Sequence, residues 1–143
     1  MQIPDDIGSA SYRWDDIYAT NGVIQTSDSR LKENIDDLQY GLEDVMKLKP
    51  VTFNWIDKPE KGTKIGFLAQ ELNMVIKEAV YEDEEGKTDI LGVNYADLVP
   101  VLTKAIQEQQ IEIEKEKAKN KLQQQEINEL RREINELKDL INK

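Results

Sequence analysis

The C-terminal third of the chain carries a seven-residue apolar repeat, and this repeat constrains the fold more than any other feature. With Ile106 taken as heptad position a, seven a positions fall in one register, and six of them are β-branched. The a positions are Val99, Ile106, Ile113, Asn120, Ile127, Ile134 and Ile141, and the d positions are Leu102, Gln109, Glu116, Gln123, Leu130 and Leu137. Such a repeat predicts one continuous helix, with residues 99–143 as a coiled-coil segment.

The charges beside this repeat indicate that the helices run parallel. In a parallel arrangement the g and following e positions pair Glu112 with Lys117, Glu126 with Arg131 and Glu133 with Lys138, which are opposite in sign each time. An antiparallel arrangement would set mostly like charges against each other. The number of helices stays open on these residues alone, because Ile at a with Leu at d favours two. The polar layers at Gln109, Glu116, Asn120 and Gln123 set the register at a cost in stability.

Upstream of the repeat, short helical and strand patterns alternate. An apolar stripe at Leu38, Leu42, Val45 and Met46 predicts a helix over 38–48, and Pro50 ends it. Val51, Phe53 and Trp55 alternate with polar residues, which is typical of a half-buried strand. A second strand is expected over 64–68, a helix over 69–76, and a hairpin from 80–82 and 90–93. The predicted class is α+β, with a small antiparallel sheet and short helices before the long C-terminal helix.

Composition excludes several functional classes. A net charge of −10 and a pI near 4.6 disfavour nucleic acid and anionic membranes as partners. We find no apolar run long enough to span a bilayer and no signal-peptide pattern. No metal or other cofactor is expected. A core drawn from about residues 27–98 buries so little surface that the domain is only marginally stable alone, which favours a homo-oligomer.

The absence of histidine and cysteine limits the possible catalysis. A Ser-His-Asp triad and a thiolate nucleophile are both excluded. Ser27 and Lys32, five residues apart, are the remaining nucleophile and base at close spacing. A helix would point them about 140° apart, so Ser27 must lie on a turn or extended arm that folds back over Lys32. The alternative reading makes Ser27 and Asp28 turn or cap residues, and Lys32 a solvated charge.

Three separated segments carry a resemblance to a known family. TSDSRLKENI (26–35), GFLAQEL (66–72) and VNYADLVPVLTKAIQE (93–108) resemble the intramolecular chaperone auto-processing domain of phage tail spikes, endosialidases and neck-appendage fibres. The resemblance implies a homotrimer that assists folding of an upstream fibre on the same polypeptide and then cuts itself off. Carried over, the catalytic residues are Ser27 and Lys32, and the cut bond is Thr26–Ser27. The activity implied is that of a single-turnover, self-cleaving serine endopeptidase.

The same resemblance assigns the remaining parts of the chain. Residues 1–26 would be the β-rich end of a fibre stalk, 27–98 the chaperone domain and 99–143 the trimerisation helix. The implied location is a virion-associated fibre precursor that folds in the host cytoplasm, with the chaperone part released. The rival interpretation is a trimerisation and attachment module that does not cleave.

Four residues are candidates for a supporting role in the cleavage. A lysine acts as a base only if its pKa falls from about 10.4 toward neutrality, which desolvation on assembly would provide. Asp28 suits the turn between the serine and the lysine. Asn34 or backbone amides are candidates to stabilise the oxyanion. Gln70 and Glu71 match the AQE of the family, where they orient catalytic groups or simply cap and pack a helix.

Overall fold

A computed structural model describes residue 14, residues 16–18, 20 and 22, and the ranges 24–82 and 89–142. The predicted β-rich fibre end falls mostly on residues outside this description, and the described residues among 14–26 belong to no helix or strand. The elements follow in the order η1 (Ser29–Leu31), α1 (Leu42–Val45), β1 (Val51–Phe53), η2 (Pro59–Lys61), β2 (Lys64–Gly66), α2 (Ala69–Asn73), η3 (Lys77–Ala79), β3 (Val80–Tyr81), β4 (Gly92–Val93), η4 (Tyr95–Asp97) and α3 (Leu98–Ile141), where η marks a 3-10 turn. The predicted α+β class, with a long C-terminal helix, is confirmed.

The strands form two separate antiparallel ladders rather than one small sheet. β1 pairs with β2, so that Val51 faces Gly66, and β3 pairs with β4, so that Val80 faces Val93. α2 and η3 lie between the two ladders in the sequence. The alternating pattern predicts strand as far as Trp55, but the ladder ends at Phe53. The indole of Trp55 instead packs edge-on against the Phe53 ring, with the ring centroids 5.2 Å apart.

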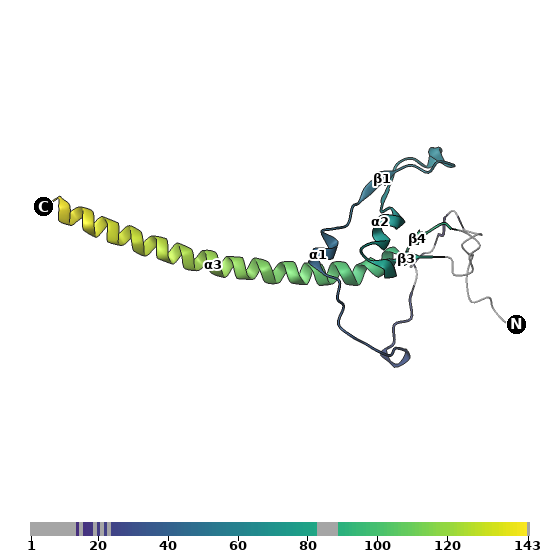
Figure 1. The fold of residues 1–143 in the computed structure, drawn as a ribbon, viewed down its shortest axis with the longest axis horizontal. Coiled ribbons are helices and arrows are strands. Elements are labelled where there is room, and N and C mark those ends of the chain that lie inside the picture. Colours follow the sequence, from purple (N-terminus) through teal and green to yellow (C-terminus); the bar gives the residue numbers. More distant parts are fainter. Residues whose placement is uncertain are drawn as a thin grey trace.

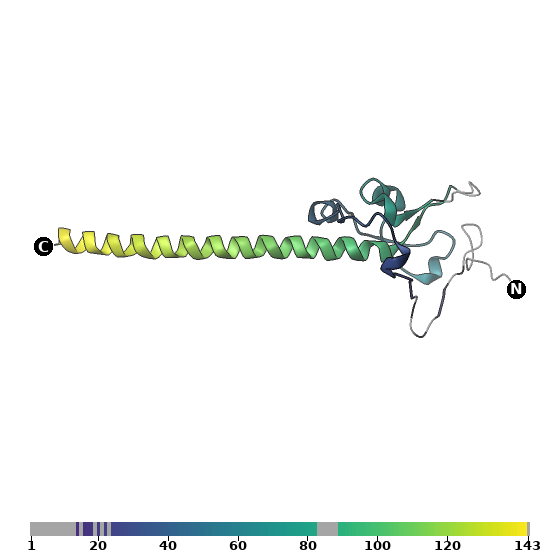
Figure 2. The same cartoon turned by 90° about the horizontal axis from the view of Figure 1, so that it is seen from below.

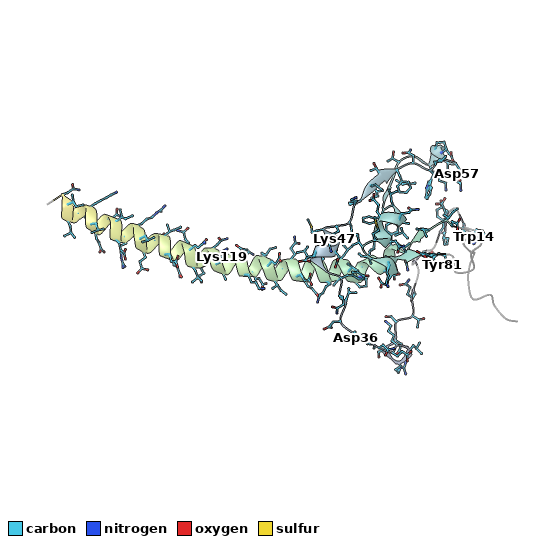
Figure 3. The ribbon with its side chains drawn as sticks, viewed as in Figure 1. Trp14, Asp36, Lys47, Asp57, Tyr81 and Lys119 are labelled. Carbon is cyan, nitrogen blue, oxygen red and sulfur yellow. The ribbon has the colours of Figure 1, made fainter. Side chains whose placement is uncertain are left out.

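The core is small and lies where α2, η3 and the first turns of α3 meet. Its buried side chains are Leu72, Ile76, Ala79, Leu98 and Val101. The β1–β2 hairpin projects from this core in Figure 1 and carries Ile56 and Ile65, which are almost fully exposed. Figure 3 labels Asp57 near the tip of the hairpin. A core of this size stabilises a folded chain only marginally by itself.

One contact joins the segments 66–72 and 93–108 in the fold. The hydroxyl of Tyr95, in η4, accepts a hydrogen bond from the backbone N–H of Phe67 at 3.2 Å, and the two rings also pack against each other. The same hydroxyl occupies the space that a Cβ at Gly66 would need. Gly66 is therefore required by close approach, and the contact joins β2 to the start of α3.

α3 has two apolar faces at its N-terminal end. Leu98, Val101 and Ala105 are buried against the core and occupy heptad positions g and c. The a and d side chains of the same turns, such as Leu102 and Ile106, stay exposed. The two faces lie about 110° apart around the helix, from 3.6 residues per turn. The domain therefore covers one side of α3 and leaves the heptad face uncovered.

Beyond the core, α3 continues as an isolated rod. Every residue from Gln109 to Asn142 is exposed, and Figures 1 and 2 show the helix leaving the core without further contact to the described chain. Its 44 residues give a length of about 66 Å. Within the described ranges, no helix combines the length with the apolar content that a bilayer crossing needs.

Substitution of Gly66 tests the contact with Tyr95. Gly66→Ala should cost about 1–3 kcal/mol of stability, because the new methyl group displaces the Tyr95 hydroxyl. Gly92→Ala is the matched control, since a Cβ there meets the Tyr81 Cβ at an ordinary 3.6 Å. Thermal unfolding at one fixed chain concentration measures both variants. Equal midpoints for the two would show that the contact has no energetic weight.

Candidate functional site

The structure places Ser27 and Lys32 side by side, and these two residues form a dyad. The Lys32 Nζ donates a hydrogen bond to the Ser27 Oγ at 2.8 Å. The two residues flank η1, and both Asp28 and Lys32 have extended backbone conformations. The single 3-10 turn reverses the chain between two extended ends, which brings the side chains together despite their spacing of five.

Asp28 and Arg30 hold the turn. The Asp28 carboxylate caps η1 by accepting a hydrogen bond from the Arg30 backbone N–H at 2.9 Å, and it also pairs with the Arg30 guanidinium at 2.6 Å. The guanidinium contact and then the backbone contact lower the pKa of Asp28. The carboxylate therefore stays ionised at neutral pH. Asp28 lies beside the dyad as a turn-forming residue, and its side chain points to Arg30 rather than to Lys32.

Asn34 bends the chain just after the dyad. Its φ of 51° makes it the one non-glycine residue in the described ranges with a positive φ. Asparagine tolerates this conformation better than most residues. Its role as an oxyanion donor remains a prediction.

Gln70 and Glu71 lie on α2, apart from the dyad. Glu71 faces Lys49, with 3.8 Å between the Lys49 Nζ and a carboxylate oxygen, and Gln70 is exposed. In Figure 1, α2 and η1 lie on opposite sides of the beginning of α3. Within one chain these two residues are not brought to the serine, and a catalytic role for them also stays a prediction.

The dyad lies on an exposed arm, which we define as residues 24–39. Figure 3 marks its position with Asp36, away from the hairpin tip at Asp57. Every hydrogen bond of the arm in the described structure joins two of its own residues. Three large apolar side chains of the arm are mostly exposed, namely Ile24, Leu31 and Ile35. Nothing in the described chain covers the dyad.

The arm joins the folded core at residues 40–42. The Tyr40 hydroxyl donates a hydrogen bond to the Glu78 carboxylate at 2.7 Å, and the Leu42 backbone N–H donates to the Glu108 carboxylate at 2.8 Å. The Tyr40 contact lowers the pKa of Glu78 and raises the pKa of Tyr40. The contact is therefore favourable over the wide pH range between the two. Sequence reasoning missed Glu78 and Glu108, because each meets its partner across 38 or 66 residues and no local pattern marks it.

Comparison with known proteins assigns this part of the chain. A family model described as the chaperone of endosialidase matches residues 27–81, and the match begins at Ser27. Residues 27–81 are thus similar in sequence to the chaperone of endosialidase, and the core into which they fold also includes Leu98 and Val101 of α3.

Two curated relatives are long tail fibre proteins. The long tail fibre protein Gp37 of Enterobacteria phage M1 is 36% identical over 98 residues, which cover 65% of this chain and 39% of the relative. The protein of the same name from Enterobacteria phage Ox2 is 36% identical over 92 residues, covering 61% of this chain and 37% of the relative. The chain thus spans less than two fifths of the length of these relatives.

The capping contact of η1 can be tested directly. Asp28→Ala should unwind η1, because the Arg30 N–H loses its acceptor, whereas Asp28→Asn should keep the turn through its amide oxygen. Backbone chemical shifts of residues 29–31 measure the difference. The ion pair forms above the ordinary aspartate pKa of 3.8 and is lost as the pH falls through the lowered value. If the backbone chemical shifts of residues 29–31 lost their turn character already at pH 5, Asp28 could not be the cap that holds η1.

Proposed function

We propose that this chain is an intramolecular chaperone of a phage fibre that trimerises, assists folding of the fibre part upstream, and releases itself by cleaving Thr26–Ser27. The observation that carries the proposal is the 2.8 Å hydrogen bond between the Lys32 Nζ and the Ser27 Oγ. It brings a nucleophile and a base within reach in a chain that has neither histidine nor cysteine. The start of the family match at Ser27, the first residue after the expected cut, supports the same site.

The names of the two relatives support a fibre context for the proposal. Because two of them are named long tail fibre proteins, we infer that this chain is a part of a virion-associated fibre precursor. Its folding in the host cytoplasm and release of the chaperone part belong to the same proposal. Its partners are two further copies of itself and the fibre part of the same polypeptide.

The chemistry follows from the order of the bond and the nucleophile. The Ser27 Oγ attacks the carbonyl carbon of Thr26, and its proton passes to a neutral Lys32 Nζ. The Thr26–Ser27 amide breaks as the lysine returns the proton to the leaving nitrogen, which leaves Thr26 esterified to the Ser27 oxygen. Water then hydrolyses the ester, giving a Thr26 carboxylate and a restored serine hydroxyl. Each chain cuts once.

The single chain keeps this chemistry switched off. In it the Lys32 Nζ donates a hydrogen bond to the Ser27 Oγ, whereas in the reaction a neutral lysine amine has to accept the serine proton. Desolvation is the effect that favours a neutral lysine, and the exposed arm offers none. We infer that assembly covers the arm, because Leu31 and Ile35 beside the dyad present exposed apolar surface that packing would bury.

The uncovered heptad face of α3 supports the assembly. The a and d side chains remain exposed along the helix, and an isolated amphipathic helix of this kind gains most of its stability by packing. The oppositely charged g and e pairs favour parallel helices, and the family resemblance favours three. The chaperone domain sits outside this face, so three copies can join along α3 without displacing it.

Ser27→Ala gives the first test of the proposed function. We expect the purified wild-type chain to yield a fragment that begins at Ser27, and Ser27→Ala to yield none, because the variant lacks the attacking oxygen. N-terminal sequencing identifies the fragment, and sedimentation equilibrium should give three times the chain mass of 16.5 kDa for the uncut variant. A wild-type chain that stays uncut after long incubation would favour the attachment module, and a dimer mass would exclude the trimer.

Lys32→Arg separates a base from a bystander charge. Arginine keeps its proton in proteins, so Lys32→Arg should block cleavage as completely as Lys32→Ala. Wild-type cleavage should rise with pH and then level off, because only the neutral amine acts as the base. Asp28 does not contribute to this rise, since its lowered pKa keeps it ionised throughout. Efficient cutting by an assembled Lys32→Arg trimer would contradict the dyad.

A further inference from the structure

The arm that carries the dyad is attached to the core through one short junction. Its own hydrogen bonds are internal, and the first residues beyond it with long-range contacts are Tyr40 and Leu42. Upstream, Asp16 forms an ion pair with Lys61 of η2 at 3.1 Å. The arm thus connects the segment that contacts the hairpin with the junction at residues 40–42. The junction is the nearer of these two attachments to Lys32 in the sequence. Whatever fixes residues 40–42 therefore fixes the direction in which the arm leaves the core.

Glu108 of α3 closes this junction. Its carboxylate Oε2 accepts a hydrogen bond from the Leu42 N–H, the first amide of α1, at 2.8 Å. Gly41 is buried against the same carboxylate, and a Cβ at that position would overlap both carboxylate oxygens. The Gly41 N–H is held separately by the Asp44 carboxylate at 3.2 Å. The Glu108 carboxylate thus lies on the backbone of the junction with no side chain between them.

The position of Glu108 on α3 matters as much as its contact. It occupies heptad position c, on the face of Val101 and Ala105 and away from the exposed a and d residues. It is the last half-buried residue of α3 in the described chain, and every described residue from Gln109 onward is exposed. Glu108 is therefore the point where the long helix makes its outermost contact with the domain.

We infer that Glu108 is a positioning residue that couples assembly along α3 to the direction of the arm that carries the Ser27–Lys32 dyad. The inference rests on the proposed function. Assembly through the a and d face fixes α3, the Glu108 carboxylate fixes the beginning of α1 on α3, and the junction directs the arm toward its place in the assembly.

α1 cannot supply this rigidity by itself. It has four residues, and a single turn of helix is unstable without outside contacts. A hydrogen bond to an ionised carboxylate is shorter and stronger than one between neutral groups. Without it, the partly buried Leu42 N–H would lose its partner, and the junction would have to move to expose it fully to water.

Four single substitutions test the inference in the cleaving chain, and two of them are tested again in uncleavable Ser27→Ala chains. In the cleaving chain, Glu108→Ala should slow the appearance of the Ser27 fragment about tenfold or more, the factor expected for loss of a hydrogen bond to a charged group. Glu108→Gln keeps an acceptor oxygen and should retain most of the rate. Glu114→Ala is the matched control, because it removes the same charge from an exposed b position of α3, where its described contact is with Gln110. All should remain trimers by sedimentation.

Gly41→Ala completes a double-mutant cycle. Alone it should slow cleavage by pushing the Glu108 carboxylate from its place, and it should add little to Glu108→Ala, since the overlapping group is then gone. Additive effects of the two substitutions would show that Gly41 and Glu108 act independently, and would contradict the proposed role of their contact.

The second background distinguishes failure of the inference from failure of the proposed function. In uncleavable Ser27→Ala chains, amide hydrogen exchange of residues 40–45 should accelerate with Glu108→Ala and not with Glu114→Ala. If the wild type cleaves and assembled Glu108→Ala cleaves equally fast, the coupling is wrong while the self-cleavage stands. If no chain cleaves, the proposed function is wrong. If amide hydrogen exchange of residues 40–45 is also unchanged in Glu108→Ala, Glu108 does not hold the junction.

Discussion

The packing of the first turns of α3 against α1 and against the core residues of α2 and η3 is the constraint on which the rest of the structure depends. Leu98, Val101 and Ala105 fill the side of the helix that faces the core. Their offset of about 110° from the heptad face leaves room for other helices on α3. If the domain packed on the a and d side chains, it would have to dissociate from α3 before the helices could associate. Because the two faces are separate, folding of the domain and association of the helices need not compete for the same side chains.

The chemistry of the dyad is set by solvent and charge as much as by distance. The hydrogen bond between Lys32 and Ser27 is already short in the single chain, so proximity is not what the proposed assembly adds. A net charge of −10 favours the ammonium form of any lysine. Removal of water is then the remaining effect strong enough to favour the amine. In the proposed mechanism, cleavage therefore reports that the arm has been covered, which happens only after packing is complete.

The sequence predicted the features that come from repeating or local patterns. The heptads predicted α3, alternation predicted β1, and the spacing of Ser27 and Lys32 predicted a turn that folds the chain back. The contacts that position the arm were not predictable, because Glu108 and Leu42 lie 66 residues apart. The split into two ladders depends on how α2 and η3 pack, which strand patterns do not encode. The need for Gly66 became evident only once the Tyr95 hydroxyl was seen beside it.

Self-cleavage happens once in each chain, and the proposed mechanism places two conditions on the arm before it can occur. Covering the dyad requires surface from outside the single chain, and directing it requires the junction at Gly41 and Glu108. A chain that folds without partners meets the second condition alone, and a misassembled oligomer can meet the first while the arm points elsewhere. In the proposed mechanism, cleavage then removes the chaperone from a fibre that could not readily refold without it. The fibre is afterwards held by the height of its unfolding barrier rather than by equilibrium stability, so a premature cut cannot be repaired. An exposed dyad that reacts only when both conditions hold provides the required delay.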